Sequence, residues 1–418
     1  MERLRRSLLV LFAVGLGASI TLSQASLAAL TLLWLWGLRD PARRAAVRLP
    51  LLGPVLAFVA ATLASAMASA EPLTSLVASK GLLLALALWV TADLLSGRGE
   101  ALRWLGLLAL VATVAAAVGV AQVAFCPGEL ERGTLGRWFF HRCDRARGFF
   151  SIYMTLAGIL VLMLLATAPR LIARGPYRGR AVASWGVMVL GLGATYTRGA
   201  WLGFAAGILA LLPFLRRGRV ALAGVLVALV GVGLAGPHEL QNRLLKMADP
   251  EEAGVKERVY MWRSATEMWA GQPWLGVGPG GVKRLYAGFA LPDAFKKRTG
   301  HVHNTPLQIL VERGLIGFAA WLWIWVAFYA RAGALLRRLR AEREAERDLV
   351  VACLAAVTGF LVAGLAEYNF GDSEVVMVLW ALMALPFALE PAGAGGGEAK
   401  ARSAGKDPSP NEPSRSTA

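Results

Sequence analysis

Two histidines close together are the first residues of this sequence that could do chemistry. His301 and His303 stand just before Pro306, where a long apolar run begins. A His at the end of a membrane helix can act as a general base near neutral pH, or donate a hydrogen bond to a phosphate or a sugar. The pair could also bind a metal ion, but zinc needs at least three protein ligands, and no further His or Cys stands nearby. We therefore expect no metal and no cofactor.

Arg198 is the second such residue, because it lies between two apolar runs with almost no connecting loop. An ionisable group at that depth is costly to place, and by default it faces a polar cavity with a function. The alternative is that the side chain snorkels to the membrane surface. We favour the functional interpretation.

Two further segments are polar and cationic, and they span residues 126–148 and 237–305. Basic loops can simply contact lipid headgroups, and for any single residue that is the more probable role. The clustering favours a shared anionic ligand for the group. The basic residues of the first segment are Arg132, Arg137, Arg142, Arg145 and Arg147, and those of the second are Arg243, Lys246, Lys256, Arg258, Arg263, Lys283, Arg284, Lys296, Lys297 and Arg298.

The elements that position these residues must lie in lipid. The chain has 418 residues, of which 56% are hydrophobic and 17% charged, which is too apolar for an ordinary soluble domain. Although a net charge of +17 could indicate a nucleic-acid partner, most of the charges sit in short loops, and we expect no nucleic acid. Apolar runs predict about twelve membrane helices. The expected spans are 7–22, 25–38, 49–68, 73–95, 101–125, 149–168, 181–197, 199–215, 219–236, 306–330, 349–366 and 374–389.

The positive-inside rule orients these spans. With the N-terminus in the cytoplasm, the Arg-rich short loops all fall inside, and the two cationic segments fall outside. Both termini are then cytoplasmic. The expected parts are N-terminal membrane helices 1–125, an external cationic loop 126–148, membrane helices 149–236, a large external loop 237–305, C-terminal membrane helices 306–390 and a disordered cytoplasmic tail 391–418.

The large external loop shows signs of folding. Residues 257–269 carry apolar side chains at helical spacing, which is typical of a helix lying in the membrane interface. The Gly- and Pro-rich stretch 272–281 that follows suggests a chain of turns more than a phosphate-binding loop. Cys126 and Cys143 flank the other loop and could form a disulfide in an oxidising compartment.

Four motifs, in this order and on the same side of the membrane, resemble the O-antigen ligase and polymerase family of bacterial envelope enzymes. The resemblance covers the chain from about Cys126 to Asp372. One departure is Ser151-Ile-Tyr-Met, where the family commonly has an Asn-Pro-Asn-like sequence. The motifs are Arg145-Ala-Arg-Gly148-Phe-Phe, Thr195-Tyr-Thr-Arg198-Gly-Ala-Trp, Arg258-x-x-x-Trp262 followed by Gln-Pro-Trp-Leu-Gly276-Val-Gly278, and His303-Asn304-x-x-Leu307-x-x-x-x-Glu312-x-Gly314.

The resemblance implies an all-α, GT-C-like membrane glycosyltransferase that uses a glycan on undecaprenyl diphosphate at the periplasmic face of the bacterial inner membrane. In the ligase the glycan moves to a sugar of the lipid A core, in the polymerase to another lipid-linked glycan, and in related oligosaccharyltransferases to a protein. One large external loop and a short tail favour the ligase. From a different class, a transporter of an anionic lipid-linked substrate is the alternative, although broken or charged helices at mid-membrane are few.

By the resemblance, His303 matches the essential His and would activate the acceptor or stabilise the donor, while Arg198 and Arg258 would bind the diphosphate. Arg145 is a weaker diphosphate candidate. A direct displacement would invert the anomeric carbon, since no well-placed external carboxylate pair is evident apart from Glu367 and Asp372. Further candidates for the diphosphate are Arg142, Arg147 and Arg263, and secondary candidates are His301, Asn304 and Glu312.

Overall fold

The protein is described here from a computed structural model. It describes residues 2–95, 97–126, 143–172, 178–215, 219–220, 222–227, 241, 245–246, 249 and 251–390. Three predictions fall outside these ranges, wholly or in part. They are the tail 391–418, the candidate Arg142, and the span 219–236, of which only residues 219–220 and 222–227 are described.

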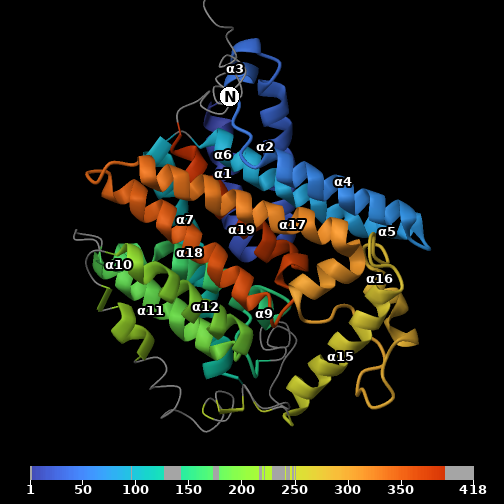
Figure 1. Cartoon of the computed structure of the whole chain (residues 1–418). Coiled ribbons are helices and arrows are strands. Elements are labelled where there is room, and N and C mark those ends of the chain that lie inside the picture. Colours follow the sequence, from blue (N-terminus) through green and yellow to red (C-terminus); the bar gives the residue numbers. More distant parts are fainter. Residues whose placement is uncertain are drawn as a thin grey trace, which may run out of the picture.

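Within the described residues every regular element is a helix, so the all-α prediction is confirmed there (Figure 1). Short 3₁₀ stretches join some of them, including Ser79–Ala85 between α5 and α6. The α-helices are α1 Glu2–Ala18, α2 Ile20–Gly37, α3 Pro41–Ala46, α4 Leu52–Ala68, α5 Pro72–Ala78, α6 Leu86–Leu94, α7 Gly97–Ala124, α9 Tyr153–Thr167, α10 Pro169–Ile172, α11 Arg178–Ala194, α12 Arg198–Leu211, α15 Ala253–Ala270, α16 Gly281–Leu285, α17 Thr305–Arg338, α18 Glu344–Ala363 and α19 Ser373–Ala388.

Apart from 219–236, the predicted membrane spans fall on helical parts of the chain, although the span 7–22 crosses the break at Ser19 between α1 and α2. Four helical stretches are long and apolar enough to cross a membrane, judged by length and composition within the described ranges. Shorter apolar helices accompany them, among them α4, α9 and α19. The molecule is therefore a multi-pass helical membrane protein. The four long stretches are Ile20–Gly37, Pro72–Leu94, Gly97–Ala124 and Thr305–Arg338.

Two helices form the centre of the bundle because they are apolar on all sides. Every residue of α19 from Val375 to Ala388 is buried, and α9 is buried at nearly every position from Thr155 to Thr167. Around them, α12 crosses α18 at a pair of glycines. A Cβ on Gly203 would overlap the carbonyl oxygen of Gly359, so the crossing requires small residues, as in many membrane helix pairs.

The long segment before α17 builds a small core of its own. Met261, Ala265 and Met268 of α15 pack against Tyr286 and Val302 in a cluster separate from that of the bundle. In Figure 1, α15 and α16 lie together at one end of the molecule, beside the start of α17. The helix predicted over 257–269 is present, and protein covers its apolar side.

Helix α17 is broken one third of the way along. Gly314 has φ 62° and ψ −171°, a backbone conformation that favours glycine. The stretch Pro273–Gly278 docks at this break, where Val277 N–H donates to Val311 O at 3.0 Å and Leu315 N–H donates to Pro273 O at 2.8 Å. The Gly-rich motif after α15 thus fastens the loop to a membrane helix. That agrees with the predicted chain of turns.

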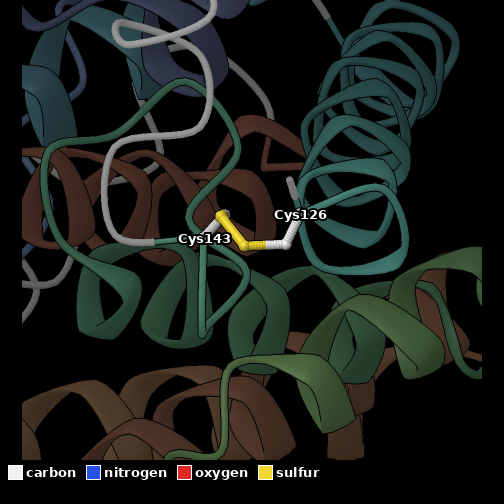
Figure 2. The surroundings of a disulfide bond; sticks show 2 residues. All are labelled: Cys126 and Cys143. Atoms are coloured by element: carbon white, nitrogen blue, oxygen red, sulfur yellow. A yellow bond between two sulfur atoms is a disulfide. The ribbon is translucent and has the colours of Figure 1, made fainter. Parts of the chain in front are cut away.

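The described ends of the first cationic segment are tied to each other and to the bundle. Cys126, two residues after the end of α7, and Cys143 form a disulfide with their Cα atoms 5.6 Å apart (Figure 2). Further along, Gly148 has φ 58°, and its N–H donates to Gln122 Oε1 of α7 at 3.0 Å. A Cβ at Gly148 would lie 2.6 Å from the Ala115 carbonyl oxygen. The glycine of the first motif therefore allows the loop to pack tightly against α7.

Candidate functional site

A cavity of about 420 Å³ lies where residues 251–303 meet the ends of the bundle helices. Its walls come from the start of α9, the start of α12, the first turns of α15 and the segments before α17 and after α18. Four of the predicted site residues line it, from four separate parts of the chain. They are Arg145, Arg198, Arg258 and His303.

His303 is held by a carboxylate that the sequence placed in a short external turn. Its Nδ1 lies 3.1 Å from Glu367 Oε2, and the other oxygen of Glu367 accepts a hydrogen bond from Arg258 Nη2 at 2.8 Å. One carboxylate therefore joins the candidate base to one of the candidate diphosphate ligands. His303 has φ 50°, which is rare for a residue other than glycine and persists only where the surroundings enforce it.

The first residues of α17 fix Glu367 in turn. Thr305 Oγ1 donates to the carbonyl oxygen of Glu367 at 2.9 Å, and Asn304 Nδ2 donates to Leu365 O at 3.0 Å. The oxygen of the Asn304 side chain caps α17 by accepting from Leu307 N at 2.9 Å. Asn304, a secondary site candidate, thus holds the segment after α18 in place instead of lining the cavity.

Arg198 stands at the first turn of α12 and carries a different partner. Its Nη2 donates to Glu252 Oε1 at 3.1 Å, and Glu252 also caps α15 by accepting from Val255 N at 2.9 Å. Burial raises the pKa of Glu252, but the hydrogen bond from Arg198 and those from the backbone outweigh it and leave the pKa below its ordinary value. Nearby, Tyr196 also has a positive φ of 51° and lines the cavity.

Two more cations complete the cavity wall. The guanidinium of Arg145 stacks over the Tyr153 ring at 4.4 Å. The second is Lys296, whose backbone is held by Glu257 of α15. The buried carboxylate of Glu257 accepts hydrogen bonds from the backbone N–H groups of Phe295 and Lys296, both at 2.9 Å. Lys296 counted among the loop cations in the sequence but was not singled out as a site residue.

The other predicted site residues lie outside the cavity lining. Arg147 is half-buried beside the Gly148 turn, and Arg263 is exposed on α15. Glu312 is buried behind the site and bonds to Gln308 and Arg313.

His301 contacts the His303 ring with the two ring centroids 4.4 Å apart. Burial, followed by the neighbouring His303, lowers the pKa of His301 to about 4. His301 is therefore a neutral ring at neutral pH. Such a ring packs beside the candidate base but supplies no positive charge for a diphosphate.

Sequence reasoning did not select two carboxylates that matter here, Glu252 and Glu367. Glu367 was noted only as half of a pair with Asp372, but Asp372 caps α19 by accepting from Glu374 N at 3.1 Å and does not line the cavity. Glu252 was missed because the helix was predicted only from Glu257, whereas α15 begins at Ala253 and Glu252 caps it. Within the described ranges, no three His, Cys, Asp or Glu side chains group closely enough to hold a metal ion.

The arrangement has a definite chemical character. Several cations face one cavity, which suits an anion with spread charge such as a diphosphate, and a His paired with a carboxylate can take a proton from a hydroxyl. Fold and site together define a multi-pass helical membrane protein with a cation-lined cavity and a His–Glu pair.

Comparison with known proteins adds the family. Residues 183–322 match the family model described as O-antigen ligase, so this segment is a domain of that family. The resemblance that the motifs predicted is confirmed over the matched segment, which contains Arg198, Arg258 and His303 but neither Arg145 nor Glu367. No curated protein matches the chain. The family indicates glycosyltransferase-type activity on lipid-linked glycans.

Proposed function

We propose that this protein is an O-antigen ligase, which transfers a glycan from undecaprenyl diphosphate to a sugar of the lipid A core. The observation that carries the proposal is the convergence of Arg198, Arg258 and His303 on one cavity. The three residues span 105 positions of the chain, so the fold and not the local sequence brings them to one cavity. All three lie within the segment that matches the ligase family.

The proposed chemistry is a direct displacement. The acceptor hydroxyl oxygen attacks the anomeric carbon, the bond from that carbon to the diphosphate oxygen breaks, and its electron pair leaves with undecaprenyl diphosphate. The hydroxyl proton passes to His303. With Nδ1 directed to Glu367, the other ring nitrogen, Nε2, is the one that can accept it. Arg198 and Arg258 bind the leaving diphosphate.

The displacement inverts the anomeric centre. The cavity does contain carboxylates, but Glu367 already binds Arg258 and His303, and Glu252 binds Arg198. We therefore assign neither as a nucleophile. A transferred linkage that keeps the configuration of the donor would contradict this assignment.

The proposed topology has both termini in the cytoplasm and the cavity in the periplasm of the bacterial inner membrane. The Cys126–Cys143 disulfide supports it, because disulfides persist in the periplasm and are rare in the cytosol. We expect both cysteines to resist alkylation in intact cells until a reductant is added. Recovery of both as free thiols would count against an external first loop.

The test of function uses purified protein in detergent, a glycan on undecaprenyl diphosphate and lipid A core as acceptor, without added metal. We expect glycan-bearing core lipid from the native protein and none from His303→Ala or Arg198→Ala. If the lipid-linked glycan lengthens instead, the protein is a polymerase, and transfer to an added protein would make it an oligosaccharyltransferase. If nothing transfers to any acceptor, the ligase proposal fails and a transporter becomes the better account.

A further inference from the structure

A buried polar network lies behind His303, and its members do not line the cavity. Gln308, Glu312 and Arg313 stand on the first three turns of α17 and are 1%, 3% and 8% exposed. Buried polar groups are costly unless each is satisfied. This network is satisfied by specific partners, which makes its geometry informative.

The amide of Gln308 makes one bond from each end. Its Oε1 accepts from the backbone N–H of Val302 at 3.0 Å, and its Nε2 donates to Glu312 Oε1 at 2.9 Å. Val302 is the residue between the two histidines. On its other side, the carbonyl oxygen of Val302 accepts from Trp262 Nε1 of α15 at 2.9 Å. Side chains of two helices thus hold this single residue by both of its backbone polar groups.

Val302 and Glu312 together decide which way the Gln308 amide faces. The other oxygen of Glu312 accepts from Arg313 Nη1 at 3.2 Å, and Arg313 Nε reaches Thr62 Oγ1 of α4 at 3.3 Å. The backbone N–H of Val302 can only donate, so the oxygen of the Gln308 amide must face it. The amide nitrogen is then left to donate to Glu312.

We propose that Gln308 is a positioning residue that holds His303 in its left-handed backbone conformation. The inference rests on the proposed function, since it assigns Gln308 to the same reaction. A strained backbone must be enforced by its neighbours. The bond from the Val302 N–H to Gln308 of α17 holds the residue directly before His303. Gln308 touches neither the cavity nor any cation that lines it, so it acts on the base and not on donor binding.

An exchange of two residues tests the proposal. Gln308→Glu sets a second carboxylate against Glu312 and removes the donor between them. The double variant Gln308→Glu with Glu312→Gln restores it, because the new carboxylate accepts from Val302 N–H and from the new amide. Gln308→Met keeps the length and buried volume and removes both bonds. Trp262→Phe is the matched variant on the other side of Val302.

The readout is the separation of kcat from the KM for the lipid-linked donor, measured beside thermal unfolding. We expect Gln308→Met to lower kcat about 10- to 100-fold with the donor KM within a factor of two, since a base displaced by about 1 Å costs rate on that order. Gln308→Glu should be at least as impaired, and the exchanged pair should recover most of kcat. Trp262→Phe should lower kcat in the same direction.

Either of two results would overturn the proposal. One is an unchanged kcat in a folded Gln308→Met variant, and the other is an exchanged pair no better than Gln308→Glu although its unfolding temperature is restored. Failure of the ligase function is a separate outcome, because it appears in the native protein as a lack of glycan-bearing core lipid. The comparison of variants can then be run with whichever acceptor the native protein uses.

Discussion

The two sides of the cavity are built differently. On one side, His303 is fixed by Glu367, which in turn is fixed by Thr305, a side chain that is only 1% exposed. On the other side, Arg198 meets Glu252 in an ion pair whose side chains remain 21% and 24% exposed. The base is thus held by a buried network, while the cation is held by a partner that a ligand can replace. A site that activates a hydroxyl needs fixed geometry, and a site that takes up a diphosphate needs cations that can exchange partners.

Substitution of Glu367 should give the largest effect, because this carboxylate holds His303. In Glu367→Gln the side chain keeps its size but loses the charge that binds Arg258 and stabilises a protonated His303. We expect kcat to fall about 10²-fold, within the range for loss of acid–base assistance, in the transfer assay. Asp372→Asn is the matched control, because Asn also caps helices well and Asp372 does not line the cavity. Equal losses in both variants would mean that Glu367 is only a structural residue.

Arg198→Lys should affect the other side of the cavity, where Arg198 meets Glu252. The charge is kept, but the planar two-point contact with phosphate oxygens is lost. We expect the donor KM to rise about tenfold, equivalent to about 1.4 kcal/mol, with a smaller change in kcat. Transfer rates over a range of donor concentrations measure both. A variant with normal KM and reduced kcat would place Arg198 in the activation machinery instead.

Glu252→Gln should change the donor KM in the opposite direction. Removing the carboxylate frees Arg198, so we expect the donor KM to fall by about two- to threefold, as for a partly exposed ion pair. Because the pKa of Glu252 is lowered, its interaction with Arg198 is fully present above the ordinary pKa and is lost only as the pH falls through the depressed value. The gain should therefore be the same at about pH 7 and about pH 5. A higher KM in the variant would show that Glu252 helps to bind the donor.

His301 should give the smallest effect. Because burial lowers its pKa to about 4, it is neutral at the pH of the assay and supplies no charge to the donor. We expect His301→Gln to change the donor KM by less than about twofold and to leave most of kcat, as for a packing residue near the site. A tenfold rise in KM would instead make it a ligand of the diphosphate.

Much of this molecule could be predicted from the sequence because its signals are local. Apolar run length predicted the helices, and the periodicity after Glu257 predicted α15. Arg198 was conspicuous because a charge between two apolar runs needs a reason to be there. The family motifs brought in His303 and Arg258, which the cavity then places near one another.

What could not be predicted depends on contacts between distant segments. Glu367 follows α18 and meets His303 across 64 positions of the chain, and nothing near it in sequence marks that contact. Arg147 and Arg145 are two residues apart in one motif, yet only Arg145 lines the cavity. The partners of the apolar side of α15 could not be predicted for the same reason, since the residues that cover it come after the helix in sequence.

Donor binding, separated from transfer, tests the central claim most directly. A glycan on undecaprenyl diphosphate would be titrated into the native protein, Arg198→Ala and His303→Ala without acceptor to measure donor binding. Transfer would then be measured on the same samples after acceptor is added. We predict that Arg198→Ala binds donor at least about tenfold more weakly, whereas His303→Ala binds it normally and transfers nothing. Normal donor binding by Arg198→Ala together with lost binding by His303→Ala would contradict the division of the cavity into a cationic side and an activating side.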